Sequence, residues 1–246
     1  MKMFDFEDGY GRVPAHRHLN GGGWVADTAR VDESAYVGPL AMVFGQADVF
    51  GQAEIKDQAR VYGNIQVFEQ AEIKDQAKAY GDARVFGKAK VFGSARIQGR
   101  AWVYGEAQVC DTAIIGGEAQ VCGEAIIYGR TLITEGAVVY GHALISGRAM
   151  VFGRAKVFGH SQIFGNVEIY DEAIVFDDAM VFDDAEVGGK SQIRDGSMVY
   201  GHAKVRGSLV VRGNISTSSK IIPRALLSIK EKWVGRDSRL REFCKR

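Results

Sequence analysis

The sequence predicts an all-β protein in which one chain winds into a parallel β-helix. Three observations predict this fold: an aliphatic residue recurs at every sixth position, a small residue stands two positions before almost every one of them, and glycine accounts for 31 of 246 residues while proline accounts for only 3. A fixed internal period outranks any assignment of single elements, because a repeat determines the whole fold. With 31 basic and 30 acidic side chains and 46% hydrophobic residues, the chain is not of the disordered class.

The repeat begins at Val25 and runs to Val211 without an insertion, which gives 32 hexads over residues 25–216. Val or Ile occupies the aliphatic position, called i, in 31 of the 32 hexads, with Ala79 as the exception, and Ala or Ser occupies position i+4 in 27. β-Branched side chains favour extended backbone. Since i+4 precedes the next i by two residues, both side chains point to the same side of a short strand, and we expect them to form the core.

Position i+2 is Gly in 20 hexads and Asp in 8. Both residue types tolerate left-handed backbone, so this position predicts a corner. Three corners complete a coil of 18 residues, and we expect 10 to 11 coils stacked about 4.8 Å apart.

The two ends depart from the repeat. Residues 1–24 contain Phe4, Phe6 and Tyr10 and are expected to form an N-terminal cap, because a β-helix leaves unpaired strand edges at its ends. Residues 217–246 place Ile222, Leu226 and other apolar residues on one helical stripe, which predicts a capping helix. The expected domains are therefore the cap 1–24, the β-helix 25–216 and the basic tail 217–246.

The tail carries nine basic and three acidic residues. Such a segment can bind nucleic acid or an anionic membrane, but its apolar stripe favours a capping helix with a solvated basic face. We therefore expect neither a nucleic acid nor a membrane partner. No stretch reaches about 18 apolar residues and the first residues lack the apolar core of a signal peptide, so a cytoplasmic location is expected. Three cysteines are too few for a disulfide framework.

Outward residues 18 apart should stack into columns along each face. One column at i+1 is an aromatic ladder with a single break at Cys122: Phe50, Phe68, Phe86, Tyr104, Tyr140, Phe158 and Phe176. Stacked aromatics stabilise neighbouring strands by about 0.2 to 1 kcal/mol per pair. A long apolar column is also typical of an oligomer interface or a ligand-binding surface.

Position i−1 is mostly polar in the first coils and turns apolar in the middle ones. The apolar residues there are Ile114, Ile126, Leu132, Val138, Leu144 and Met150. Outward aliphatic side chains spread over three faces indicate burial by other subunits, with contacts centred on residues 114–182.

His142 and His160 are the candidate catalytic residues. Both occupy position i+3 of successive coils, so we expect them to stack on one corner, in a column that also holds Glu124 and Asp178. Carboxylates beside imidazoles can tune a general base or bind a metal. The same position is also the most exposed one of the repeat, where any polar residue fits, and we assign no metal site.

Runs such as Val85-Phe86-Gly87-Lys88-Ala89-Lys90 resemble the hexapeptide repeat of the left-handed parallel β-helix, known from hexapeptide-repeat acyltransferases and γ-class carbonic anhydrases. Their uninterrupted regularity resembles uncharacterised bacterial and prophage hexapeptide-repeat proteins. The resemblance implies a left-handed helix and a homotrimer with parallel axes. The three zinc-binding histidines of the carbonic anhydrases have no matching set in this chain.

Two functions remain open from the sequence. Enzymes of the family interrupt their coils with a loop that walls the active site, and residues 25–216 contain no such insertion. The first hypothesis is therefore a non-catalytic rigid scaffold or binding protein, without a cofactor, that presents its aromatic faces to a protein partner. The alternative is a CoA-dependent acyltransferase that uses acetyl-CoA, with His142 or His160 as general base in a groove between subunits.

Overall fold

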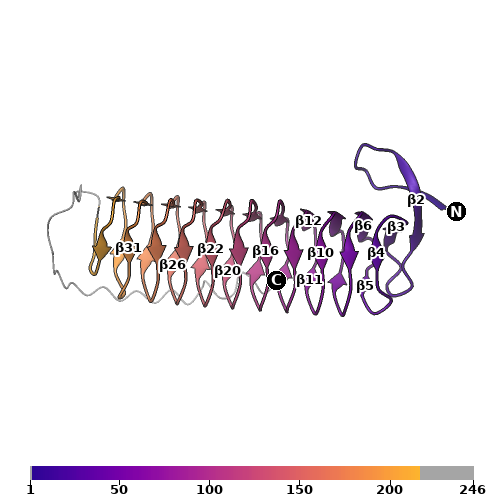
Figure 1. The fold of residues 1–246 in the computed structure, drawn as a ribbon, viewed down its shortest axis with the longest axis horizontal. Helices are drawn as coiled ribbons and strands as arrows, with labels where there is room; N and C mark the ends of the chain where they lie inside the picture. The colour runs from indigo at the N-terminus through magenta and orange to yellow at the C-terminus, as the bar shows by residue number, and fades with distance from the viewer. Residues whose placement is uncertain (1, 217–246) are drawn as a thin grey trace.

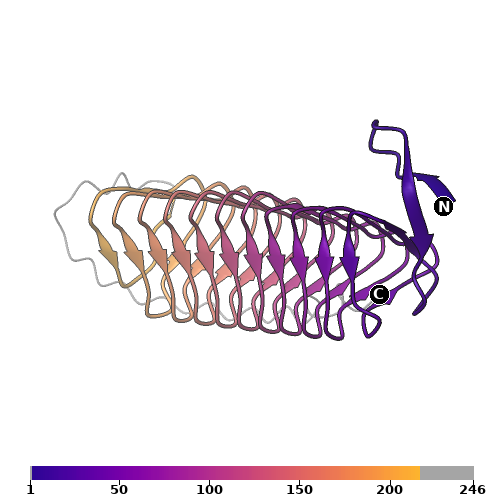
Figure 2. The same ribbon diagram turned by 45° about the vertical axis from the view of Figure 1, so that its right-hand side comes forward.

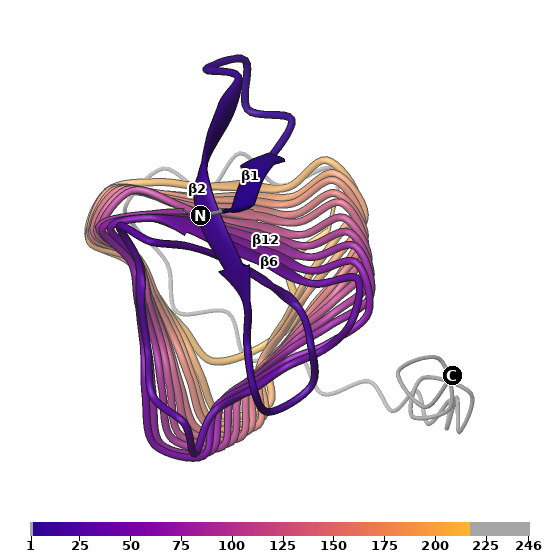
Figure 3. The same ribbon diagram turned by 90° about the vertical axis from the view of Figure 1, so that its right-hand side faces the viewer.

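The computed structural model describes residues 2–216 and confirms an all-β parallel solenoid with coils of 18 residues (Figure 1). Seen along its axis, the solenoid is a three-sided prism (Figure 3). Its described residues form strands and turns but no helix, so they contain none that could cross a membrane. The capping helix predicted within residues 217–246 lies outside the described part.

Each side of the prism is a parallel sheet, and we name the three sides face A, face B and face C. The strands of face A are β3 (Trp24–Ala26), β6 (Met42–Gly45), β9 (Arg60–Gly63), β12 (Lys78–Gly81), β15 (Arg96–Ile97), β18 (Ile114–Ile115), β21 (Leu132–Ile133), β24 (Met150–Val151), β27 (Glu168–Ile169), β30 (Glu186–Val187) and β33 (Lys204–Val205). The strands of face B are β4 (Arg30–Val31), β7 (Asp48–Val49), β10 (Gln66–Val67), β13 (Arg84–Val85), β16 (Trp102–Val103), β19 (Gln120–Val121), β22 (Val138–Val139), β25 (Lys156–Val157), β28 (Ile174–Val175), β31 (Gln192–Ile193) and β34 (Val210–Val211). The strands of face C are β5 (Tyr36–Val37), β8 (Glu54–Ile55), β11 (Glu72–Ile73), β14 (Lys90–Val91), β17 (Gln108–Val109), β20 (Ile126–Ile127), β23 (Leu144–Ile145), β26 (Gln162–Ile163), β29 (Met180–Val181) and β32 (Met198–Val199).

The interior is built as the repeat predicts. The aliphatic residues at i and the small residues at i+4 form one continuous cluster from Val25 to Ile215, and nearly all of them are fully buried. Strands of successive coils pair without slippage, for example Val103 with Val121 and Val121 with Val139. A residue and the one 18 positions later therefore stand one above the other throughout the solenoid (Figure 2).

Every i+2 corner from Gly45 to Gly207 has a positive φ, which confirms the assignment of corners. A Cβ atom placed on Gly117 would lie 2.5 Å from the backbone nitrogen of Glu135, so the close stacking of corners favours glycine. Where the corner residue is acidic, its carboxylate has a second role. Asp171 (φ 59°) accepts a hydrogen bond of 3.0 Å from the N–H of Gly189, the corner of the next coil.

The first residues form a hairpin on the outside of the prism. Strand β1 (Lys2–Asp5) pairs antiparallel with β2 (Arg12–Arg17), and β2 pairs antiparallel with β3, so the hairpin extends the sheet of face A. Phe6 is fully buried and stacks at 4.9 Å on Phe44, an outward residue of face A. Figure 3 shows the hairpin projecting beyond the outline of the coils.

Candidate functional site

The aromatic ladder predicted for one face lies on face B. Phe50, Phe68, Phe86 and Tyr104 stack with ring centroids 4.8 to 4.9 Å apart and ring planes within 2° of parallel. Tyr140 stacks on Phe158 at 4.6 Å, and Phe158 on Phe176 at 5.1 Å. Because the rings cover one another's faces, the ladder presents ring edges rather than ring faces to solvent. Within this part of the ladder, the stacked ring faces are not free to stack against a flat ligand.

Cys122 divides the ladder into two halves. Its side chain forms a hydrogen bond with Tyr104, and this bond, together with partial burial, raises the pKa of Tyr104 to about 12. Burial and the neighbouring Cys122 also raise the pKa of Tyr140. Both tyrosines therefore remain protonated hydroxyl donors at any physiological pH.

The outward aliphatic residues of the middle coils do not form one patch. Ile114, Leu132 and Met150 stand in register on face A. Ile126 and Leu144 pair on face C, and Val138 lies on face B. All six are half-buried in the single chain. Only face A thus carries three such residues in consecutive coils.

The structure brings the two candidate catalytic histidines together, as the repeat predicts. The rings of His142 and His160 stack at 4.7 Å and lie within 1° of parallel. His142 Nδ1 lies 3.3 Å from a carboxylate oxygen of Glu124, and about half of the His142 side chain is exposed. A carboxylate that orients an imidazole is the arrangement a general base uses. Among residues 2–216, no three His, Cys, Asp or Glu side chains are grouped closely enough to hold a metal.

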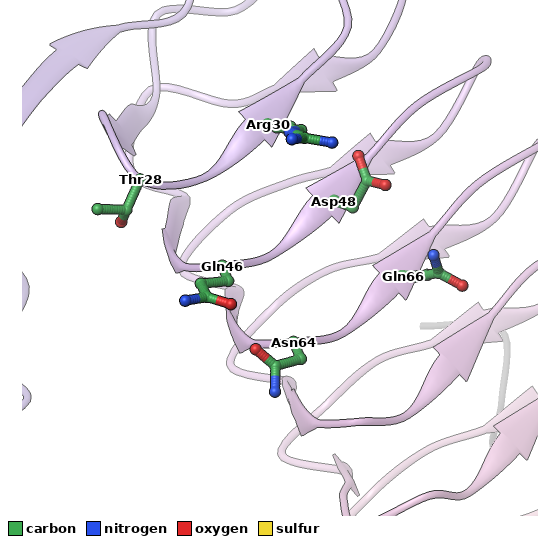
Figure 4. Close-up of a pocket in the computed structure, with 6 residues that line it drawn as sticks. All are labelled: Thr28, Arg30, Gln46, Asp48, Asn64 and Gln66. Carbon is green, nitrogen blue, oxygen red and sulfur yellow. The ribbon is translucent and has the colours of Figure 1, made fainter.

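Two open polar grooves follow the corners of the first coils. Figure 4 shows one of them, between the corner that follows face A and the strands of face B, lined by Thr28, Arg30, Gln46, Asp48, Asn64 and Gln66. The second follows the next corner and is lined largely by Gln, Glu and Lys side chains. Neither groove contains a predicted site residue, and His142 and His160 lie outside both.

A further aromatic ladder, interrupted by a gap, lies on face A. Phe6, Phe44, Tyr62 and Tyr80 stack at 4.8 to 4.9 Å, so the hairpin contributes the first ring. The column then continues as Gln98, Gly116 and Thr134 before Phe152. The start of this ladder could not be predicted, because Phe6 lies outside the repeat.

Comparisons with known proteins do not show a family for this chain. No family model and no curated protein matches the chain in sequence. Among solved structures, the UDP-N-acetylglucosamine acyltransferase of Arabidopsis matches with 13% sequence identity and a TM-score of 0.26, over 75% of this chain and 68% of the other.

Proposed function

We propose that the protein is a rigid scaffold, without catalytic activity of its own, that holds a protein partner on its laddered faces. The observation that carries this proposal is the ladder of face B, where four consecutive rings repeat at 4.8 to 4.9 Å with nearly parallel planes. The two inner rings, Phe68 and Phe86, are each restrained by a ring on both sides, and the register of the coils does not slip. A partner therefore meets a surface that loses little side-chain entropy on binding.

This proposal is tested by partner capture with matched variants. Wild-type protein, a face B variant (Phe68→Ser with Phe86→Ser) and a face C variant (Phe164→Ser with Phe182→Ser) are used to isolate binding proteins from the source cells. We expect at least one protein to bind the wild type and the face C variant but not the face B variant. Equal capture by all three folded proteins would contradict the use of face B.

A second function is favoured by one specific contact, the 3.3 Å approach of His142 to Glu124. Such a pair can serve a CoA-dependent acyltransferase as its general base, in a groove completed by another subunit. Acetyl-CoA binding would raise the melting temperature of the wild type, and His142→Ala would reduce acyl transfer. The absence of both effects at millimolar acetyl-CoA would leave the scaffold as the remaining proposal.

The finer fold assignments rest on the resemblance of the repeat. We infer left-handed winding on that basis, and a cytoplasmic location from the lack of a long apolar stretch in the sequence. The homotrimer that the resemblance implies is one assembly to be tested, and the molar mass of the protein in solution distinguishes it from a pair of chains.

A further inference from the structure

Between Lys78 and Glu186, face A carries its charges in an order that reads the same from both ends with the sign reversed. Its i−1 residues form one column, in which each pairs in register with the next: Arg60, Lys78, Arg96, Ile114, Leu132, Met150, Glu168, Glu186 and Lys204. Leu132 is the centre of this column. Arg96 and Lys78 lie two and three coils to one side, and Glu168 and Glu186 lie two and three coils to the other.

We propose that face A binds face A of a second copy of this chain, with the two long axes antiparallel and a twofold axis through strand β21. Such an axis runs along the strand direction, so each column of one copy faces the same column of the other in reverse order. Leu132 then meets Leu132, and Ile114 meets Met150. Arg96 faces Glu168 of the second copy, and Lys78 faces Glu186.

The i+1 column supports the same axis by shape. Its residues from the N-terminal side are Tyr62, Tyr80, Gln98, Gly116, Thr134, Phe152, Tyr170, Gly188 and Arg206. About Thr134, the first glycine lies opposite Phe152 and the second lies opposite Tyr80. Gly116 therefore has no side chain to oppose Phe152 of the second copy, whereas the ring of Tyr170 of the same chain already lies against the place where a Cβ atom of Gly188 would stand.

The corner column next to face A supports the axis by charge. Its exposed residues at i+3 are Asn64, Asp82, Arg100, Glu118, Gly136, Arg154, Glu172, Lys190 and Ser208. About Gly136, three pairs of opposite charge face each other: Glu118 with Arg154, Arg100 with Glu172, and Asp82 with Lys190. Within one chain, Arg100 already lies 3.2 Å from Glu118, so the pairing extends existing ion pairs into networks of four charges.

On the axis, Arg130 and Glu135, at the two corners that flank face A, each face the same residue of the second copy. In the i−1 column the unfavourable pair lies at the ends of the contact, where Arg60 faces Lys204. Both charges already have partners in their own chain, Arg60 with Glu7 at 3.7 Å and Lys204 with Glu186. Face B shows no comparable symmetry. About Gln120, its i−1 column would place Arg84 opposite Lys156.

The size of the contact is adequate for a stable pair. Eight coil spacings of about 4.8 Å and a width of about five residues at 3.3 Å give roughly 650 Å² on each copy. The total of roughly 1,300 Å² falls within the range of specific interfaces. The loop after β1 stacks on Phe44 and reaches Arg60, whose side chain donates to the carbonyl of Phe6, so at this end of the contact the second copy meets the loop as well as the coil.

Sedimentation velocity of the full chain tests the pairing. We expect a species of twice the 26.9 kDa chain mass, with dissociation promoted by high salt. Arg96→Glu should weaken the pair at least tenfold, because each substitution creates two like-charge contacts. The exchange Arg96→Glu with Glu168→Arg should restore it. Parallel copies cannot reproduce this rescue, since the two residues lie four coils, about 19 Å, apart along the axis.

A cysteine on the twofold axis gives a second readout. In a background with Cys122→Ser and Cys244→Ser, Thr134→Cys should form an interchain disulfide under mild oxidation, and the matched face B variant Val138→Cys should not. Circular dichroism checks that every variant is folded. A monomer, a mass of three chains, failure of the charge exchange to restore the pair, or equal cross-linking at both positions would each overturn the proposal.

Discussion

Face A and face B have the same interior and different exteriors. Beneath both, fully buried Val, Ile and Ala side chains fill the prism. Outside, face B stacks ring on ring from Phe50 to Tyr104, whereas face A leaves three coils without a ring at Gln98, Gly116 and Thr134. The difference shows that ring stacking need not continue along every face of a solenoid. The ring-free part of face A carries the outward residues on which the proposed antiparallel pair rests.

The largest expected effect tests whether the interiors are equivalent. Ala113→Leu under face A and Ala119→Leu under face B each add three carbons to a fully buried position. We expect each to reduce the free energy of unfolding by about 3 kcal/mol, because a close-packed interior has no room for them. Denaturant titration of both variants, with Gln120→Leu, a change at a half-buried outward position, as control, measures this. A large difference between the two losses of unfolding free energy would show that the interiors beneath face A and face B are not equivalent.

The next prediction concerns the ladder. Phe68→Ala removes a ring that stacks on two neighbours and should lower the free energy of unfolding by about 1 to 2 kcal/mol. Thr134→Ala, the matched truncation in the ring-free part of face A, should change it by no more than about 0.5 kcal/mol. Equal losses would mean that the ladder of face B adds no stability.

A smaller effect is expected when a ring is added to face A. Thr134→Tyr would stack on Phe152 and raise the stability of the single chain by about 0.5 kcal/mol. It would also place a bulky ring on the proposed twofold axis and prevent self-association. Ser146→Tyr, the equivalent change on face C, is the control and should leave the molar mass unchanged. If the Thr134→Tyr variant still has twice the chain mass in solution, this result would argue against the proposed twofold axis.

The smallest effect concerns the break in the ladder of face B. The folded chain holds the proton of Tyr104 with a pKa of about 12, above the ordinary value near 10. Its contribution to stability is therefore complete below pH 10 and is lost as the pH rises through about 12. Cys122→Ala removes the hydrogen bond and should lower the pKa of Tyr104. Phenolate absorbance measures the shift, and Tyr104→Phe identifies the transition.

The repeat predicts the interior and the corners because one period imposes both. Val121 and its equivalents are buried and every corner from Gly45 to Gly207 has a positive φ, as expected from branched residues at i and Gly or Asp at i+2. The carboxylate bonds at the acidic corners were not predicted. The sequence explains Asp171 by its tolerance of left-handed backbone, and only the stacked coils show that the same side chain accepts the N–H of Gly189.

The N-terminal segment could not be placed from the sequence. Phe4 and Phe6 indicate an apolar segment, but no period specifies whether they cover the open end or an outer face. In the structure the hairpin continues the sheet of face A, and the loop after it bonds to the first coil, where Gly23 N–H donates to the carbonyl of Val37 at 2.9 Å. The hairpin thus extends one side of the prism and the following loop bonds to the first coil, whereas we expected a single capping segment from the sequence.

The candidate site was predictable only within a single column. The stacking of His142 on His160 follows from their spacing of one coil. The charge symmetry of face A is seen only when residues as far apart as Arg96 and Glu168 are compared. These two residues come close to each other only if two copies of the chain pack together. Sequence periodicity describes neighbours within a chain and says nothing of which face meets another.

The unslipped stacking of the coils restricts how such a protein can change in length. Gain or loss of one 18-residue coil leaves the interior, the corners and the backbone ladder intact, so folding alone tolerates it almost anywhere. On face A, a coil lost between Arg96 and Leu132 would displace every basic residue on that side by about 4.8 Å against its acidic counterpart. Length variation compatible with pairing must therefore occur on both sides of β21 at once, in steps of two coils.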